Sequence, residues 1–299
     1  MSDSVGATPQ ISFEFFPPAS PEMAYKLWGS AIALGPLEPN FVSVTYGAGG
    51  TTRRRTIDAI KALRANAHLS VAGHLTCVGA TREETLAVAA EYKAAGVSRI
   101  VALRGDAPKR EDGSPGVFEQ HPGGFEGAVD LIAALDAEIG LPIAVGAYPE
   151  PHPEATTGDD DVAQLKRKFD AGADVAITQF FFDNEDFLRF RDRCAAAGVD
   201  KPILPGVLPI ENFQKMVKFA TACGATVPQR LHEAFAKVGG PEDAQALSRD
   251  LCVEQCRDLV SRGGVDHLHF YTLNTPNLTS EVCKALGVAP RSNGLAAAG

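Results

Sequence analysis

The chain has 299 residues, of which 45% are hydrophobic and 22% are charged, so it can bury a large core and lies outside the compositional class of disordered proteins. Its formal net charge of −9 disfavours a sequence-independent nucleic-acid binder, which needs a basic face. No apolar run approaches the roughly 20 residues of a membrane span, and the N-terminus lacks the features of a secretory signal, so we expect a cytoplasmic protein.

Short β-rich runs alternate with longer helical segments along the whole chain. The predicted strands are residues 11–16, 41–47, 70–77, 99–106, 142–149, 175–182, 202–209 and 267–273. The predicted helices are residues 21–34, 52–64, 81–95, 124–138, 160–171, 184–197, 211–222 and 277–286, with extra helical material over 228–262. Several helices should end at glycines such as Gly96, Gly172 and Gly198, because glycine readily takes the left-handed conformation that closes a helix.

Eight β/α units in a chain of this length predict an α/β fold, a single (β/α)8 TIM barrel with an extra helical segment before its eighth strand. A doubly wound sheet is the alternative, but no G-x-G-x-x-G sequence follows the first predicted strand. We expect the barrel to span residues 11–288, with flexible tails at residues 1–10 and 289–299.

The cysteines and histidines do not predict a metal site. No two of the six cysteines form a C-x-x-C pair, so we expect reduced packing residues. Cys252 and Cys256 share a helix face, and His267 and His269 share a strand face, but neither pair has an evident further ligand.

Polar residues lie at the predicted end of nearly every strand, where a TIM barrel carries its active site. They are Glu14, Thr45, Tyr46, His74, Thr76, Arg104, Asp106, Tyr148, Glu150, His152, Gln179, Tyr271 and Asn274. One such residue carries little information, because loops begin where strands end. Their recurrence at most strand ends favours an active site in the barrel mouth.

Glu14 is unusual because it lies within the aromatic sequence "ISFEFFPP". Burial among phenylalanines would raise the pKa of its carboxyl, and a carboxyl protonated near neutral pH can act as a general acid. Pro17 and Pro18 should then end the strand rigidly. The alternative is a structural ion pair between Glu14 and an arginine such as Arg104.

Nine sequence segments occur in an order and at intervals that resemble the bacterial 5,10-methylenetetrahydrofolate reductase family. They are "SFEFFPP", "FVSVTYGA", "HLTC", "ALRGD", "AYPEPHPEA", "LKRKFDAGAD", "ITQFFFD", "PGVLP" and "HFYTLN". The resemblance covers residues 11–288 and implies a FAD-dependent TIM-barrel oxidoreductase, assembled as a homo-oligomer. It would interconvert 5,10-methylenetetrahydrofolate and 5-methyltetrahydrofolate with NADH or NADPH, in one-carbon metabolism and methionine biosynthesis.

The resemblance also implies which residues bind cofactor and substrate. FAD binding is assigned to Thr45, Tyr46, Ala48, His74, Arg104, Gly105, Asp106, Ala128, Tyr148, His152, Ala155, Asp161, Gln164, Arg167 and Lys168. Folate or nicotinamide binding is assigned to Glu14, Thr45, Asp106, Gln179, Lys215, Phe219, Tyr271 and Thr275. An Arg–Lys pair suits a pyrophosphate on charge alone, although a solvated basic helix face is the simpler interpretation.

Glu14 and Asp106 are the implied catalytic residues. In the implied ping-pong cycle, NAD(P)H reduces FAD and leaves, and the folate then occupies the same flavin face. Glu14 would protonate a folate nitrogen so that the five-membered ring opens before hydride arrives. Asp106 would place a negative charge near the flavin and lower its reduction potential.

Two positions depart from the family pattern. Thr275 stands where many relatives have an arginine, and Lys215 stands where some have a glutamine. The competing functions are a flavin-independent pterin-binding methyltransferase barrel and a non-enzymatic binding barrel. The presence of Glu14, Asp106 and Gln179 disfavours the non-enzymatic alternative.

Overall fold

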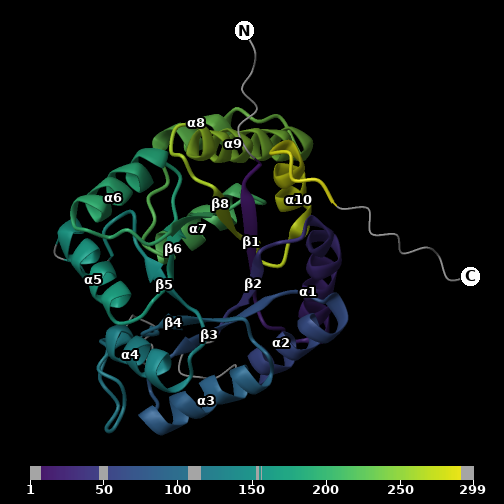
Figure 1. Cartoon of the computed structure of the whole chain (residues 1–299). Coiled ribbons are helices and arrows are strands. Elements are labelled where there is room, and N and C mark those ends of the chain that lie inside the picture. The colour runs from purple at the N-terminus through teal and green to yellow at the C-terminus, as the bar shows by residue number, and fades with distance from the viewer. Residues whose placement is uncertain (1–7, 47–52, 107–115, 153–154, 156, 291–299) are drawn as a thin grey trace, which may run out of the picture.

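The computed structural model describes residues 8–46, 53–106, 116–152, 155 and 157–290. Eight parallel strands close into a barrel in chain order, with β8 paired to β1, and helices surround them (Figure 1). The strands are β1 (Gln10–Phe15), β2 (Phe41–Val44), β3 (Val71–Thr76), β4 (Arg99–Leu103), β5 (Ile143–Ala147), β6 (Val175–Phe180), β7 (Ile203–Val207) and β8 (His267–Tyr271). The predicted TIM barrel is therefore confirmed.

The helices follow the strands as the sequence predicts, and the extra segment before β8 forms two helices. They are α1 (Pro21–Leu34), α2 (Arg53–Ala67), α3 (Arg82–Ala94), α4 (Ala128–Glu138), α5 (Gly158–Asp170), α6 (Asn184–Ala196), α7 (Phe213–Ala222), α8 (Gln229–Ala236), α9 (Pro241–Ser261) and α10 (Pro276–Ala285). Gly96, Gly172 and Gly198, which follow α3, α5 and α6, have φ angles of +74°, +118° and +79°, so the expected glycine ends are confirmed. No helix in the described ranges is long and apolar enough to cross a bilayer.

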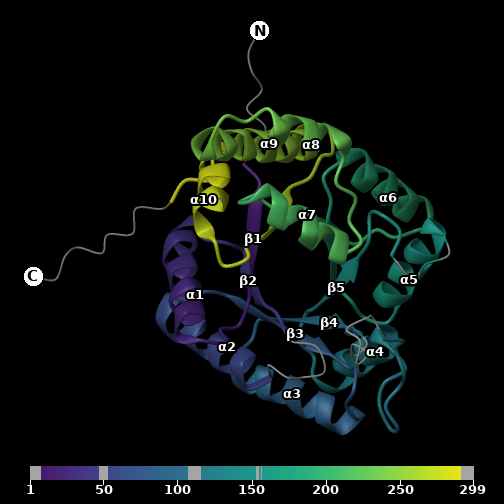
Figure 2. The ribbon, with the colours of Figure 1, turned by 180° about the vertical axis from the view of Figure 1, so that it is seen from behind.

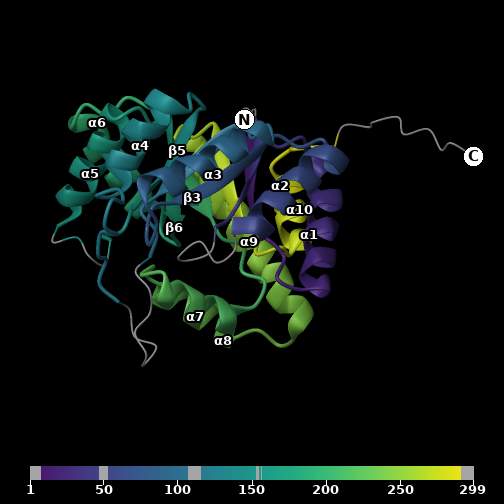
Figure 3. The same cartoon turned by 90° about the horizontal axis from the view of Figure 1, so that it is seen from below.

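The strands end one to three residues earlier than the sequence predicts. The polar residues that follow each apolar run leave the ladder and begin the loops at the C-terminal end of the barrel. Helix α7 lies across this end: it is in front of the barrel in Figure 2 and below the strands in Figure 3. The chain thus places polar groups and one covering helix at the same opening.

Alternation along β1 separates its aromatic residues from its polar ones. Phe13 and Phe15 are buried against the surrounding helices, in a core that includes Leu27 of α1. The barrel interior near the N-terminal ends of the strands is a separate apolar cluster of Phe41, Ala72, Val101, Ala144, Val175, Ile177 and Leu204. Ser12 and Glu14 alternate with the two phenylalanines, so they face the barrel interior.

Candidate active site

Glu14 lies inside the barrel between Ser43 of β2 and Tyr271 of β8, its register partners. Its side chain is 14% exposed, and its Oε2 atom lies 3.4 Å from Nε2 of His74 on β3. Burial raises the pKa of Glu14 to about 8 and lowers the pKa of His74 to about 4. At neutral pH a protonated carboxyl therefore faces a neutral imidazole.

Among the described residues, no arginine forms the ion pair with Glu14 that the structural alternative requires. Arg104 makes no ion pair with Glu14, and its guanidinium instead lies 4.9 Å from the ring centroid of Phe118. Burial in the barrel interior therefore keeps the Glu14 carboxyl protonated, whereas Phe13 and Phe15 face the surrounding helices.

Closer to the N-terminal end of the barrel than Glu14, two histidines lie within hydrogen-bond distance of one serine hydroxyl. Ser12 Oγ lies 2.8 Å from His269 Nδ1 and 3.0 Å from His267 Nε2. Burial lowers the pKa of His269 to about 3 and that of His267 to about 4, so both rings are neutral. Within the described ranges, no group of three or more His, Cys, Asp or Glu residues could hold a metal.

Four buried polar atoms on the inner wall have no hydrogen-bond partner among the described residues. They are Ser43 Oγ, His74 Nε2, Thr76 Oγ1 and His269 Nε2. Buried polar groups are normally satisfied. Their concentration on β2, β3 and β8 indicates that a ligand or water meets this wall.

The end of β4 forms a close turn over β3. The carbonyl oxygen of Arg104 accepts hydrogen bonds from the backbone nitrogens of Cys77 and Val78, at 3.2 and 3.0 Å. Gly105 has a φ of +90°, and a Cβ there would lie 2.5 Å from Cγ1 of Val78. Only glycine fits this turn. Asp106 follows it and is exposed.

A second polar group gathers where β5 meets α5. Lys168 Nζ donates to the carbonyl oxygen of Gly146 at 2.7 Å, and burial lowers the pKa of Lys168 to about 8 against the opposing effect of Asp161. Asp161 Oδ2 accepts from the His152 backbone nitrogen at 3.0 Å, and the Tyr148 and His152 rings meet edge to face at 4.6 Å.

The remaining predicted FAD residues lie around these two groups. Arg167 is exposed and donates to Gln164, away from the Lys168 amine. Ala155 donates its backbone N–H to His152, and Ala128 is the first residue of α4. Ala48 lies outside the described residues.

Thr45 and Tyr46 follow β2. The backbone nitrogen of Thr45 donates to the carbonyl oxygen of Phe15 at 3.0 Å, which fixes the end of β2 beside β1. Tyr46 is half-buried, and burial raises the pKa of its hydroxyl. Both residues therefore lie at the C-terminal end of the barrel, as the sequence predicts.

Among the predicted folate residues, Gln179 and Phe219 both contact Phe180. Gln179 Oε1 accepts from the Phe180 backbone nitrogen at 3.0 Å, and the Phe219 ring stacks on the Phe180 ring at a centroid distance of 5.5 Å. The Tyr271 hydroxyl donates to the carbonyl oxygen of Thr178 at 2.7 Å, so this hydroxyl is already engaged in the barrel wall.

Lys215 and Thr275 are both exposed. Lys215 lies one helical turn before Phe219 on α7, so both side chains project from one side of this helix. Thr275 immediately precedes α10, and its hydroxyl lies 3.4 Å from the Leu273 carbonyl oxygen.

Two residues contact the end of β1 at this opening: Thr272, which the sequence analysis does not single out, and Asn274, which it places only among the polar residues at the strand ends. Thr272 Oγ1 donates to the carbonyl oxygen of Glu14 at 2.7 Å, and Asn274 bonds both backbone groups of Phe16. The motif "HFYTLN" contains both residues, but nothing in it indicates a partner near the start of the chain.

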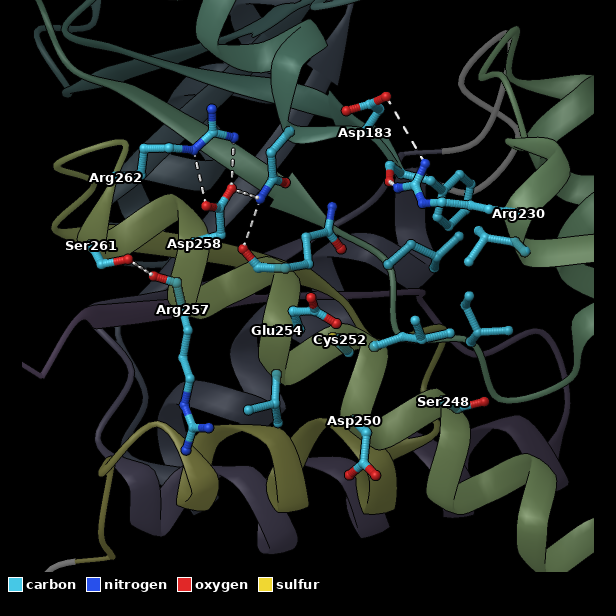
Figure 4. Close-up of a pocket in the computed structure, with 18 residues that line it drawn as sticks. Asp183, Arg230, Ser248, Asp250, Cys252, Glu254, Arg257, Asp258, Ser261 and Arg262 are labelled. Atoms are coloured by element: carbon cyan, nitrogen blue, oxygen red, sulfur yellow. Dashed lines mark hydrogen bonds and ion pairs between the residues drawn. The ribbon is translucent and has the colours of Figure 1, made fainter. Parts of the chain in front are cut away.

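A cavity of about 660 Å³ lies outside the barrel mouth between α6, α8 and α9 (Figure 4). None of the predicted site residues lines it. Several of its polar groups are paired: Arg262 contacts both Asp258 and Glu185, and Asn184 also bonds Asp258. Size alone therefore does not identify the functional site.

Comparisons with known proteins agree with this geometry. The family model for methylenetetrahydrofolate reductase matches residues 3–287. The 5,10-methylenetetrahydrofolate reductase of Pectobacterium carotovorum is 44% identical over 94% of this chain and 91% of that protein, and its Escherichia coli K12 counterpart is 43% identical with the same coverage. Methylenetetrahydrofolate reductase (NADH) 1 of Zea mays is 32% identical over 94% of this chain and 49% of the maize protein.

Solved structures support the fold independently. A Clostridium thermocellum protein that binds two copies of 5-methyl-5,6,7,8-tetrahydrofolic acid aligns with a TM-score of 0.58 at 12% identity, covering 94% of this chain and 95% of that one. At this identity the likeness concerns the fold alone. With the family model and the bacterial relatives, the barrel and its acid-bearing mouth show that this chain belongs to the methylenetetrahydrofolate reductase family.

Proposed function

We propose that the protein reduces 5,10-methylenetetrahydrofolate to 5-methyltetrahydrofolate in a ping-pong reaction that uses bound FAD and either NADH or NADPH. The observation that supports this most strongly is Glu14, a carboxyl with a pKa raised to about 8 in the barrel mouth. Opening the five-membered ring of the substrate requires a proton on a nitrogen, and Glu14 holds a proton at neutral pH.

The residues at the mouth fit FAD in charge and shape. Lys168 supplies a partly desolvated cation suited to a pyrophosphate, and Gly105 leaves a surface without a Cβ. The unpartnered hydroxyls of Thr76 and Ser43 on the inner wall are available to bond a polar ring edge. Bound FAD would supply the hydride chemistry, accepting from the nicotinamide and delivering to the folate.

The protein's own contribution is to position the reactants and to hold a proton. Glu14 keeps its proton because burial disfavours the carboxylate, and His74 cannot take that proton because burial also lowers its pKa. Gln179 and Phe219 would orient the pterin, and Asp106 would place a negative charge near the cofactor. The roles of Asp106, Gln179 and Phe219 follow from the family resemblance, as does a homo-oligomeric assembly.

The deciding experiment is a spectrum of the purified protein followed by anaerobic titration. We expect a yellow protein whose FAD bands bleach with NADH or NADPH and return when methylenetetrahydrofolate is added. A colourless protein that binds a pterin and cannot be reconstituted with FAD would instead support the methyltransferase alternative. Bleaching by NADH without recovery on adding the folate would refute the proposed substrate.

A further inference from the structure

The connection between β8 and α10 wraps around the end of β1, where Glu14 lies. Thr272 Oγ1 donates to the Glu14 carbonyl oxygen at 2.7 Å. Asn274 Oδ1 accepts from the Phe16 backbone nitrogen, and Asn274 Nδ2 donates to the Phe16 carbonyl oxygen, both at 3.0 Å. Three side-chain hydrogen bonds therefore hold the backbone on the C-terminal side of Glu14.

These bonds replace a strand ladder that has ended. The register between β1 and β8 stops at the pair Glu14 and Tyr271. Pro17 and Pro18 follow, and neither has a backbone N–H. On the other side of β1, the Phe15 carbonyl oxygen accepts from the Thr45 backbone nitrogen. The last residues of β1 are thus held from both neighbouring strands.

The turn that provides these bonds is strained. Leu273 and Asn274 have φ angles of +49° and +54°, in the left-handed region that bulky residues such as leucine avoid. Strain of this kind persists where surrounding contacts enforce it, and it clusters at functional sites. Thr272 Oγ1 also accepts from the Asn274 backbone nitrogen at 3.2 Å, which closes the turn.

We propose that Thr272 and Asn274 are positioning residues for proton transfer, fixing the backbone from Glu14 to Phe16 so that the Glu14 carboxyl stays aimed at the substrate. Neither residue is required to touch the reacting atoms. The inference rests on the proposed function, because that function makes Glu14 the acid. A misplacement of about 1 Å at such a group costs on the order of 10²-fold in rate.

The primary test compares Thr272→Val, which keeps the shape but removes the hydroxyl, with Thr272→Ser, which restores it. Thr272→Val should slow the folate half-reaction about tenfold, as expected for a partial misplacement, and leave reduction by NADH within about twofold. Thr272→Ser should recover most of the rate. Asn274→Gly removes both bonds to Phe16 and tolerates the left-handed backbone at this position, so it should act in the same direction and serves if Thr272→Val does not fold.

Thr279→Val is the matched control. Thr279 lies in α10, is 0% exposed, and its hydroxyl has no partner among the described residues. The same chemical change is therefore made nearby without altering a bond to β1. Both half-reactions should be unchanged.

A double substitution separates positioning from general structural damage. If Thr272 acts through the acid, Thr272→Val should have no further effect on the folate half-reaction in a Glu14→Gln background. Equal slowing in both backgrounds, or equal slowing of both half-reactions by Thr272→Val, would overturn the inference.

A stability measurement tests the inference without relying on turnover. His74 of β3, Tyr271 of β8 and Cys223 after α7 face Glu14. Loosening the strand end admits water and returns the pKa of Glu14 toward its usual range. The change in melting temperature that Glu14→Gln causes should then vary less with pH when Thr272→Val is present.

The folate half-reaction and the stability measurement together distinguish a failure of the proposed function from a failure of the positioning inference. If the unmodified protein cannot reduce the folate, the proposed function is wrong, and the stability readout still decides whether Thr272 sets the surroundings of Glu14. If the unmodified protein reduces the folate but Thr272→Val changes neither readout, only the positioning inference is wrong.

Discussion

The outer cavity is larger than the hollows of the barrel mouth, but the mouth has more of the features of a binding site. The outer cavity is large and has several paired charges, as Arg262 with Asp258 illustrates, and one unpartnered buried atom, Asn184 Oδ1. The mouth contains smaller hollows, yet its wall holds a protonated Glu14 and the unpartnered hydroxyls of Ser43 and Thr76. Unsatisfied buried polar groups cost free energy in a folded chain. They therefore mark a binding site better than volume does.

The comparison predicts that replacing one carboxyl group by the corresponding amide has opposite effects in the two regions. In the mouth, the change should remove function and stabilise the fold. In the cavity, it should leave function unchanged and slightly destabilise the fold.

The largest effect should come from Glu14→Gln. Losing a general acid typically lowers a rate by about 10²–10⁴. The variant should be reduced by NADH at the normal rate and reoxidised by methylenetetrahydrofolate more slowly by this factor, as stopped-flow absorbance would measure. Equal slowing of both half-reactions would mean that Glu14 is structural.

The same substitution should stabilise the fold, increasingly so as the pH rises. The pKa of Glu14 is raised from 4.5 to about 8 in the folded state, so the folded chain binds more protons than the unfolded chain between these values. The stability contributed by protonated Glu14 is complete below about 4.5 and is lost as the pH rises through about 8.

Glutamine cannot ionise, so Glu14→Gln should gain stability over the unmodified protein across this interval. The gain is at most about 5 kcal/mol, and the 14% exposure of the side chain reduces it. Denaturant unfolding at several pH values measures it. The buried histidines titrate in both proteins and cancel in the difference. A pH-independent difference would contradict the raised pKa.

A smaller effect is expected at the rim of the mouth, where Lys215 and Thr275 are both solvent-exposed. We expect Lys215 to replace part of the charge that an arginine at position 275 gives to relatives. Lys215→Gln should raise the KM for the folate by up to about fivefold, the scale of an exposed ion pair, with little change in reduction by NADH.

Thr275→Arg should lower this KM, most strongly in the Lys215→Gln background. Measuring the double-mutant cycle at two salt concentrations tests a shared ligand charge, since exposed charge interactions are screened by salt. Additive effects that do not depend on salt would show that the two positions act separately.

The smallest effect should come from the cavity. Hydrogen bonds from Arg262 and Asn184 lower the pKa of Asp258, so its stabilising contribution is present above its ordinary pKa and is lost as the pH falls. Asp258→Asn should lower the free energy of unfolding at neutral pH by about 0.5 kcal/mol and leave both half-reactions unchanged.

Glu254→Gln is the control for this substitution. Glu254 lines the same cavity but forms no ion pair within the described part of the chain. Its replacement should change neither stability nor activity. A loss of folate reduction in Asp258→Asn would show that the cavity has a role in function.

Local sequence patterns were sufficient to predict the barrel. Proline at the start of α1 and the glycines after α3 and α5 fix helix ends through backbone preferences that act within a few residues. The raised pKa of Glu14 was also predicted, but its cause differs: Phe13 and Phe15 face the surrounding helices, and the barrel interior buries the carboxyl.

The partners of the site residues were not predictable, because they depend on register. Tyr271 reaches the Thr178 carbonyl oxygen because the pairing of β6 and β7 shifts between Ile177 and Phe180. Gly206 permits this approach: a Cβ there would lie 2.3 Å from the Thr178 oxygen. No pattern within one strand specifies such an arrangement, which involves three strands.

The pairing of β1 with β8 also affects how the protein is made. The ribosome delivers Glu14 early, but the hydrogen bond from Thr272 joins residues 258 positions apart. Until His267 and the residues after it emerge, one edge of β1 is unpaired, and such edges invite aggregation. Closing so long a loop also slows folding. A nascent chain halted before β8 could therefore contain all of the strands from β1 to β7 and still lack the bonds that position Glu14.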